Sequence, residues 1–173
     1  PIVSIAGQTA TVTGTGDNIT WSAVYPMASG DNETASVSLN IGFSDLAGNP
    51  GIAIDNTTNG SAVEFDKTPP TLPSVTIASN NTLYTTMAKT GDNITLSITS
   101  SEAIQTPTVR IAGQTATVTG SGTSWSAAYT MTSSYSSNVP VSLSVSFSDL
   151  AGNTGSTTST TNSSAVQFDK ILP

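Results

Sequence analysis

Short stretches in which apolar and polar residues alternate follow one another along the second half of the chain. Residues 94–98 are typical, because isoleucine or leucine alternates there with threonine or serine. In an extended strand, a period of two places the apolar side chains on one face and the polar ones on the other. Seven such stretches occur, at residues 75–77, 94–98, 109–111, 116–118, 125–131, 141–147 and 166–168. None has a helical period, so the sequence predicts an antiparallel β-sandwich with a polar outer face, in which a turn at Gly113 and Gln114 separates the third and fourth strands.

Three blocks of sequence occur twice. IAGQTATVTG at residues 5–14 returns at 111–120, FSDLAGN at 43–49 returns at 147–153, and SAVEFDK at 61–67 returns as SAVQFDK at 164–170. The copies are 103 to 106 residues apart, an interval that fits a small β-sandwich module. Self-similarity at a fixed interval is typical of proteins built as arrays of like modules.

Seven strands with this spacing predict an immunoglobulin-like order, with the strands conventionally lettered A to G. The first copy matches the second only from Pro1, which aligns with Pro107. We therefore predict tandem immunoglobulin-like antiparallel β-sandwiches: an incomplete module at residues 1–66, which lacks strands A and B, and a complete module at residues 67–173. Without strand B, apolar side chains such as Trp21 would lose one wall of their core. Either the chain is a stretch of a longer repeat protein or a neighbouring chain supplies the two strands.

Composition excludes several classes of function. Charged residues make up 9% of the chain and the net charge is −7, with four lysines and arginines in total. There is thus no basic patch of the kind on which nucleic-acid binding depends. The chain has no histidine and no cysteine, which removes the usual general base, thiol chemistry and zinc–thiolate sites. We expect a protein that is not an enzyme, and no apolar run is long enough for a membrane span in this segment.

Two motifs, SDLAGN and the AVxFDKTPP of residues 62–70, resemble the bacterial Ig-like repeats of large surface adhesins and biofilm-associated proteins. The resemblance covers nearly the whole chain. It implies an extracellular stalk on the bacterial cell surface, or a secreted fibre, in which the partners are neighbouring Ig-like modules of the same or an identical chain. It also implies that Ca²⁺ often stiffens the junctions between modules and that ligand binding belongs to other domains.

Acidic and amide side chains form the best candidate site. Asp66 lies in the junction between the copies, Glu102 follows the second predicted strand, and Asp149 and Asn153 follow the sixth. In an immunoglobulin-like order these positions fall at the pole where the second copy meets the first. Ca²⁺ takes six to eight oxygen ligands from carboxylates, amides, carbonyls and water. The sequence therefore indicates a possible calcium site at the junction.

The first copy repeats part of this arrangement. Asp45 and Asn49 occupy the same positions in their turn, and Asp17 on a neighbouring loop could join them. The alternative is that Asp-Leu-Ala-Gly-Asn is only a turn, in which the aspartate caps its own backbone and the glycine takes a positive φ. Both interpretations stay open at this stage.

Two rows of side chains suggest other functions. Trp125, Tyr129 and Met131 could form a platform for a carbohydrate, although their alternation with alanine on the same face favours a core. Threonines at 115, 117 and 119 could form an ice-binding face, although a solvated strand explains them more simply. The alternatives to a stalk are thus a carbohydrate- or ice-binding β-sandwich, and a filament subunit that assembles by β-strand complementation.

Overall fold

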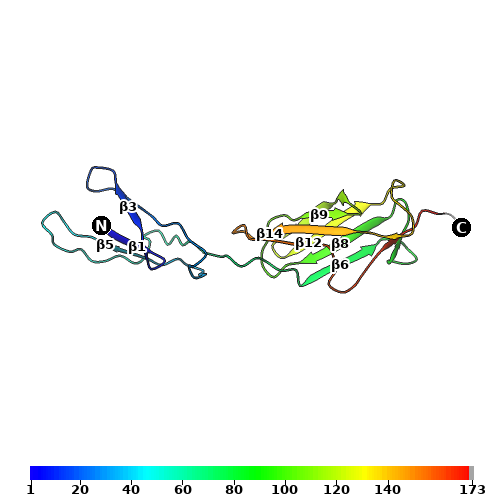
Figure 1. The fold of residues 1–173 in the computed structure, drawn as a ribbon, viewed down its shortest axis with the longest axis horizontal. Helices are drawn as coiled ribbons and strands as arrows, with labels where there is room; N and C mark the ends of the chain where they lie inside the picture. Colours follow the sequence, from blue (N-terminus) through cyan, green and yellow to red (C-terminus); the bar gives the residue numbers. More distant parts are fainter. Residues whose placement is uncertain (172–173) are drawn as a thin grey trace. The chain divides into compact units, whose positions relative to one another are not determined.

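The computed structural model describes residues 1–171, which form β-strands joined by turns and loops and contain no helix (Figure 1). The chain divides into two compact units, Pro1–Lys67 (unit 1) and Thr68–Pro173 (unit 2). Nearly all strand pairs are antiparallel. The prediction of an all-β chain is confirmed.

The first large sheet of unit 2 has the strand order β11-β12-β8-β6. Its strands are β6 (Ser74–Ser79), β8 (Asn93–Thr99), β11 (Thr117–Ser121) and β12 (Ser124–Thr130). The central strand β8 buries its apolar residues Ile94, Leu96 and Ile98 and exposes Ser97. Its alternation of threonine and serine with isoleucine and leucine thus turns one face to the core and the other to solvent.

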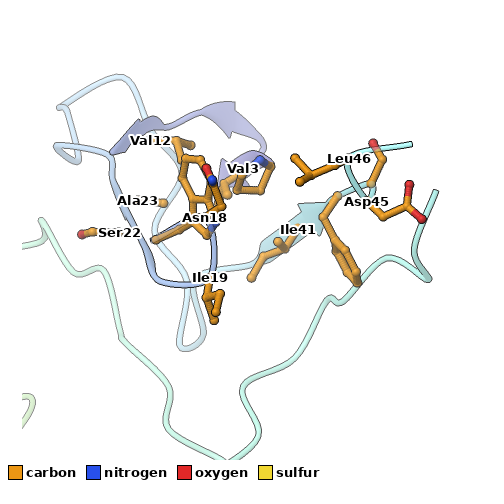
Figure 2. Close-up of a pocket in the computed structure, with 13 residues that line it drawn as sticks. Val3, Val12, Asn18, Ile19, Ser22, Ala23, Ile41, Asp45 and Leu46 are labelled. Carbon is orange, nitrogen blue, oxygen red and sulfur yellow. The ribbon is translucent and has the colours of Figure 1, made fainter. Parts of the chain in front are cut away.

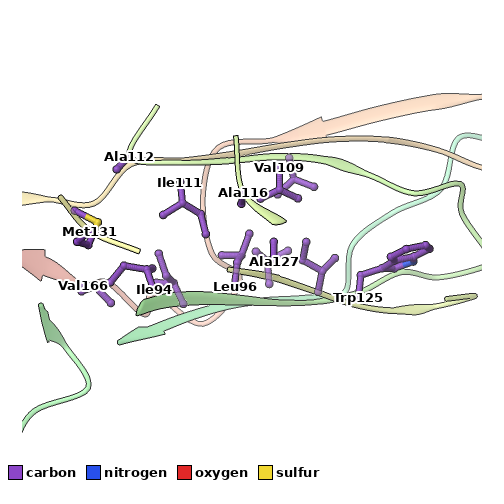
Figure 3. Packing of buried hydrophobic residues seen from close by; sticks show 14 of the residues in the cluster. Ile94, Leu96, Val109, Ile111, Ala112, Ala116, Trp125, Ala127, Met131 and Val166 are labelled. Carbon is purple, nitrogen blue, oxygen red and sulfur yellow. The ribbon is translucent and has the colours of Figure 1, made fainter. Parts of the chain in front are cut away.

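The second large sheet of unit 2 has the order β10-β9-β14-β15. Its strands are β9 (Thr108–Ile111), β10 (Gln114–Thr115), β14 (Leu143–Ser148) and β15 (Thr154–Thr157). Figure 3 shows Val109 and Ile111 pointing toward Leu96 and Ala127 of the first sheet. The buried side chains of both sheets form one continuous core, consistent with a β-sandwich.

Three short strands form a third sheet in unit 2, with the order β13-β16-β7. They are β7 (Met87–Ala88), β13 (Val139–Pro140) and β16 (Gln167–Phe168). The last predicted stretch, at 166–168, corresponds to β16, which pairs in parallel with β7. The sequence pattern did not predict β7, β10, β13 or β15.

The turn predicted at Gly113 and Gln114 lies one residue earlier. Ile111 pairs with Gln114, so the two residues of the turn are Ala112 and Gly113, with φ of 55° and 75°. A two-residue hairpin turn with positive φ at both positions matches the right-handed twist of its strands. The prediction was wrong because alanine rarely adopts this conformation, whereas asparagine and glycine do so readily.

Unit 1 contains two small sheets, with the orders β2-β1-β5 and β3-β4. The strands are β1 (Ile2–Ile5), β2 (Gln8–Thr9), β3 (Thr11–Gly14), β4 (Trp21–Val24) and β5 (Leu39–Gly42). Their registers repeat those of unit 2: Val3 pairs with Ile41 as Val109 pairs with Val145. Similarly, the pairing of Val12 with Ala23 repeats that of Val118 with Ala127. The two units therefore form equivalent strand pairs from equivalent sequence segments.

The difference between the units lies beside β4. In unit 2 the corresponding strand β12 lies between β11 and β8, whereas β4 pairs with β3 alone. Trp21 of β4 is 47% exposed, and its counterpart Trp125 is 8% exposed. Only Val3 and Ala10 are buried apolar residues in unit 1. The apolar side chains of unit 1, such as that of Ile41 in Figure 2, are thus less covered than their counterparts in unit 2.

Candidate metal centre

Asp149 organises the turn that joins β14 to β15. Its Oδ1 accepts hydrogen bonds from the backbone N–H groups of Gly152, at 2.6 Å, and Asn153, at 2.8 Å. Its Oδ2 accepts a hydrogen bond of 2.8 Å from the side-chain Nδ2 of Asn153. Gly152 has a φ of 101°, which a residue with a β-carbon adopts only under strain. The expected turn chemistry is therefore present in this segment.

The Asp149 carboxyl group is buried but ionised at neutral pH. Burial raises its pKa, while hydrogen bonds from Asn153 and the backbone N–H groups of the turn lower it by more. The net result is a pKa below the usual value of an aspartate. The side chain is 1% exposed, so its charge is held inside the protein by hydrogen bonds of the turn.

A loop after β8 brings Glu102 to this turn. Ile104 forms a β-bridge with Asp149, and Gln105 donates hydrogen bonds from its backbone N to Ser148 O, at 2.8 Å, and from its Nε2 to Asp149 O, at 2.9 Å. Glu102 is half-buried and offers a carboxylate oxygen within 4.8 Å of a carboxylate oxygen of Asp149. Two carboxylates this close are mutually repulsive when both are ionised, and a bound hard cation relieves the repulsion.

Asp66 belongs to unit 1, where both of its neighbours are anchored. Phe65 N donates to Thr34 O at 2.9 Å, and Lys67 N donates to Glu33 Oε1 at 2.9 Å. The ammonium group of Lys67 donates to the carbonyl oxygens of Ser29, at 3.0 Å, and Asp31, at 2.8 Å. The half-buried Asp66 is therefore held in a defined place at the end of its unit.

The candidate residues of the first copy form separate turns. Asp45 caps its turn as Asp149 does, accepting hydrogen bonds of 2.8 Å from the backbone N and from the Nδ2 of Asn49, which lower its pKa. Asp17 accepts hydrogen bonds from the backbone N–H groups of Thr20 and Ile19, which hold its pKa far below the usual value. All three side chains are exposed. Within residues 1–67, no three acidic side chains gather as possible metal ligands.

One buried carboxylate was not among the predicted site residues. Asp92 is 7% exposed and accepts hydrogen bonds from the backbone N of Lys89, at 2.9 Å, from Lys89 Nζ, at 2.7 Å, and from Asn81 Nδ2, at 2.8 Å. Burial raises its pKa, and the contacts with Lys89 and Asn81 lower it by more. The Lys89 side chain is 68% exposed, so this cluster joins two loops at the surface. The spacing of Lys89 and Asp92 is a sequence signal for the ion pair, but Asn81 lies on a distant loop.

The two rows of side chains differ in exposure. Trp125 and Met131 are buried in the core of unit 2, as their alternation with alanine favoured. The exposed threonines are divided between sheets, because Thr115 lies on β10, whereas Thr117 and Thr119 lie on β11. These three threonines therefore do not form a single continuous row on one sheet.

Across residues 1–171, no helix is long and apolar enough to cross a membrane. In comparisons with known proteins, no protein-family model, no curated protein and no solved structure matches this chain. Its function is therefore inferred from its internal repeat, the packing within each unit and the chemistry of the Asp149 turn.

Proposed function

We propose that the chain is a structural segment of an extracellular bacterial adhesin stalk or surface fibre, built from tandem immunoglobulin-like modules. The main observation in support is that the same strand registers occur in both compact units and are formed by equivalent sequence segments. In arrays of this kind, stability arises within each module and between nearest neighbours, and the array serves to span distance. The proposed role is mechanical and not catalytic.

The short connection between the units supports this role. Lys67 is anchored in unit 1 by its three hydrogen bonds. Thr71 is anchored in unit 2, since its N–H donates to Ser101 Oγ at 3.0 Å and its carbonyl oxygen accepts from Ser101 N at 2.9 Å. Between them lie Thr68 and two prolines, the second of which is already buried. Proline has a fixed φ, so a linker of this length and composition is stiff.

Calcium at the junction is the second element of the proposal. Glu102 and Asp149 contribute neighbouring carboxylate oxygens on unit 2. Asp66 precedes Thr71 by five residues, which span at most about 18 Å when fully extended. Thr71 is hydrogen-bonded to Ser101, the neighbour of Glu102. The length of the chain therefore allows Asp66 to supply a further oxygen ligand to a cation at the Asp149 turn.

Thermal unfolding of the full chain tests the calcium element. A cation present at 100 times its dissociation constant adds about 2.7 kcal/mol to the stability of the folded state. We expect a higher Tm in millimolar Ca²⁺ than in EDTA, and loss of this difference in Glu102→Gln. Asp55→Asn, which neutralises an exposed acid that is not one of the candidate ligands, is the control. Equal Tm values of the unchanged chain in Ca²⁺ and in EDTA would rule calcium out.

Single-molecule stretching of the full chain from its two ends tests the mechanical element. We expect unit 2 to unfold in one step at a measurable force. Its extended chain spans about 350 to 380 Å at about 3.3 to 3.6 Å per residue, and the step should equal this length less the end-to-end length of the folded unit. It should refold when the force is removed. Extension without a resolvable step would contradict the proposed stalk, and binding to a glycan or to ice would favour the rival function.

A further inference from the structure

A surface loop that follows β5 in unit 1 contains the sequence Asn59-Gly60-Ser61, and Asn59 is the only asparagine of the chain that is followed by glycine. All three residues are exposed. The amide carbon of an asparagine side chain reacts with the backbone nitrogen of the following residue when the two atoms approach and close a five-membered ring. Glycine allows the closest approach because it has no β-carbon. This loop is therefore a candidate site of spontaneous chemical modification.

The nucleophile of such a reaction, the backbone nitrogen of Gly60, is accessible. Within residues 1–171, no backbone acceptor is hydrogen-bonded to this nitrogen. A β-carbon built on Gly60 would meet no atom within 4 Å, so the space around the residue is open. Its φ of 72° is one that glycine adopts without strain. The nitrogen therefore reacts without first losing a place in a strand ladder.

The electrophile is the side-chain amide of Asn59, which is already polarised. Its Oδ1 accepts a hydrogen bond of 3.0 Å from the backbone N–H of Ser61. Attack on the amide carbon places negative charge on this oxygen, and an N–H group directed at the oxygen stabilises that charge. A second hydrogen bond, of 2.7 Å from Thr57 Oγ1 to Ser61 O, holds the loop closed. All of the groups that take part thus lie within residues 57–61.

Unit 2 contains an equivalent loop that differs at the reacting residue. Asn162 Oδ1 accepts a hydrogen bond of 3.0 Å from Ser164 N, and Thr160 Oγ1 donates to Ser164 O at 2.9 Å. The residue after the asparagine is Ser163, and its φ of 60° is close to that of Gly60. The side chain of a serine lies beside its own backbone nitrogen and hinders attack by that nitrogen. The two loops therefore share their hydrogen bonds and differ in the access to the nucleophile.

We propose that Asn59 is a site of spontaneous deamidation in the folded protein. Hydroxide removes the proton of Gly60 N, this nitrogen forms a bond to Asn59 Cγ, and the bond between Cγ and Nδ2 breaks. Nδ2 takes a proton from water and leaves as ammonia, which restores the hydroxide. Water then opens the resulting succinimide ring at either of its carbonyl carbons. Opening at Cγ gives aspartate, and opening at the main-chain carbonyl carbon gives isoaspartate.

Either product changes unit 1 permanently. A carboxylate replaces a neutral amide, which adds one negative charge to the net charge of −7. In isoaspartate the main chain runs through the former side chain of residue 59, so the turn at this position contains a further carbon atom. The modified chain is therefore separable from the unmodified chain by anion exchange, where Asn59→Asp serves as a standard for the charge of the product.

Incubation of the full 173-residue chain at mildly alkaline pH tests the proposal. Peptide mapping by mass spectrometry measures aspartate and isoaspartate at each asparagine over time. We expect deamidation at Asn59 to be at least about tenfold faster than at Asn162, and to accelerate with pH because the reacting nitrogen must lose its proton. A synthetic peptide of residues 55–64 is the reference for an unfolded loop. Asn59 that stays intact in the chain while the peptide deamidates completely would overturn the proposal.

Exchange of the two residues that follow the asparagines tests the role of Gly60. Gly60→Ser copies the loop of unit 2 and should slow deamidation at Asn59 to the rate at Asn162. Ser163→Gly should raise the rate at Asn162 to that at Asn59. Both positions are exposed and have similar φ values, so each loop accommodates the residue of the other. Unchanged rates in both variants, or a rate at Asn59 that does not depend on pH, would overturn the ring-closing route.

Discussion

Substitution of tryptophan by alanine should cost much more stability in unit 2 than in unit 1. Trp125 and Trp21 occupy equivalent positions of β12 and β4, and each is followed by serine and alanine. Trp125 is 8% exposed and Trp21 is 47% exposed. The pair therefore compares one side chain in a covered and in an uncovered core.

The magnitude follows from the difference in buried area. The exposed fraction of Trp21 is about 40 percentage points higher than that of Trp125. Because a fully buried tryptophan removes up to about 250 Å² from water, the difference corresponds to about 100 Å² of additional exposed surface. At about 25 cal/mol per Å², this area corresponds to about 2.5 kcal/mol. Replacement of a buried aromatic residue by alanine costs about 3 to 5 kcal/mol. We expect about 4 kcal/mol for Trp125→Ala and about 1.5 kcal/mol for Trp21→Ala.

Hydrogen exchange of the full chain in increasing urea measures the two effects separately. Amides of β12 report the free energy of unfolding of unit 2, and amides of β4 report that of unit 1. Trp125→Phe and Trp21→Phe serve as controls, since each keeps an aromatic ring at its position. Equal losses for the two alanine variants would refute the reasoning, because they would mean that Trp21 is as well covered in solution as Trp125.

Three further predictions concern unit 2. Gly120→Ala should cost about 3 kcal/mol or more in urea unfolding, because Gly120 has a φ of 134° and a β-carbon there would lie 2.8 Å from Trp125 Cα. Gly122→Ala, at a φ of 60° with open space around it, should cost only about 1 to 2 kcal/mol. A larger loss of stability in Gly122→Ala than in Gly120→Ala would contradict the packing of the β11–β12 hairpin. The pKa of Asp149 is lower in the folded state than in the unfolded state. The ionised carboxylate therefore adds to the free energy of unfolding above the unfolded pKa of about 3.9, and this stabilisation is lost as the pH falls through the folded-state pKa. Asp149→Asn should therefore make the stability of unit 2 fall less steeply below about pH 4. Asp92→Ala should cost about 2 to 3 kcal/mol, and Lys89→Ala less than about 1 kcal/mol, because the carboxylate is buried and the ammonium group is exposed.

The strands that the sequence predicts best are those that alternate into the core. Residues 94–98 lie within β8 because every second side chain is buried. In contrast, β15 has the sequence Thr-Gly-Ser-Thr and contains no apolar residue. Its place is determined by the backbone ladder with β14, where Gly155 pairs with Phe147 and leaves room for the aromatic ring. A strand stabilised by its partner's side chain leaves little trace in its own sequence.

The turn geometry at the candidate site could be predicted from the sequence where the contacts are local. Asp149 and Asn153 are four residues apart, and this spacing is sufficient to indicate a capped turn. The approach of Glu102 followed from the expected strand order, and the structure places it next to Asp149. The buried Asp92 was missed because part of its environment comes from Asn81, eleven residues away, where no pattern indicates a contact.

The identity of the β-hairpin sequence in the two units has a consequence for the order of folding. In the native pairing of unit 1, strand β1 of the β1–β2 hairpin pairs with β5 and closes a loop of about 38 residues. If β9 of the equivalent β9–β10 hairpin paired with β5 in place of its own partner β14, the loop would contain about 68 residues. Loop-closure entropy grows only logarithmically with length, so the native pairing is favoured by only about 0.5 kcal/mol on this ground. Two interchangeable hairpins in one unfolded chain therefore compete for the same partner strands. During synthesis the first hairpin meets its partner before the second exists, and we expect the ribosome to keep the copies apart more effectively than refolding from denaturant does.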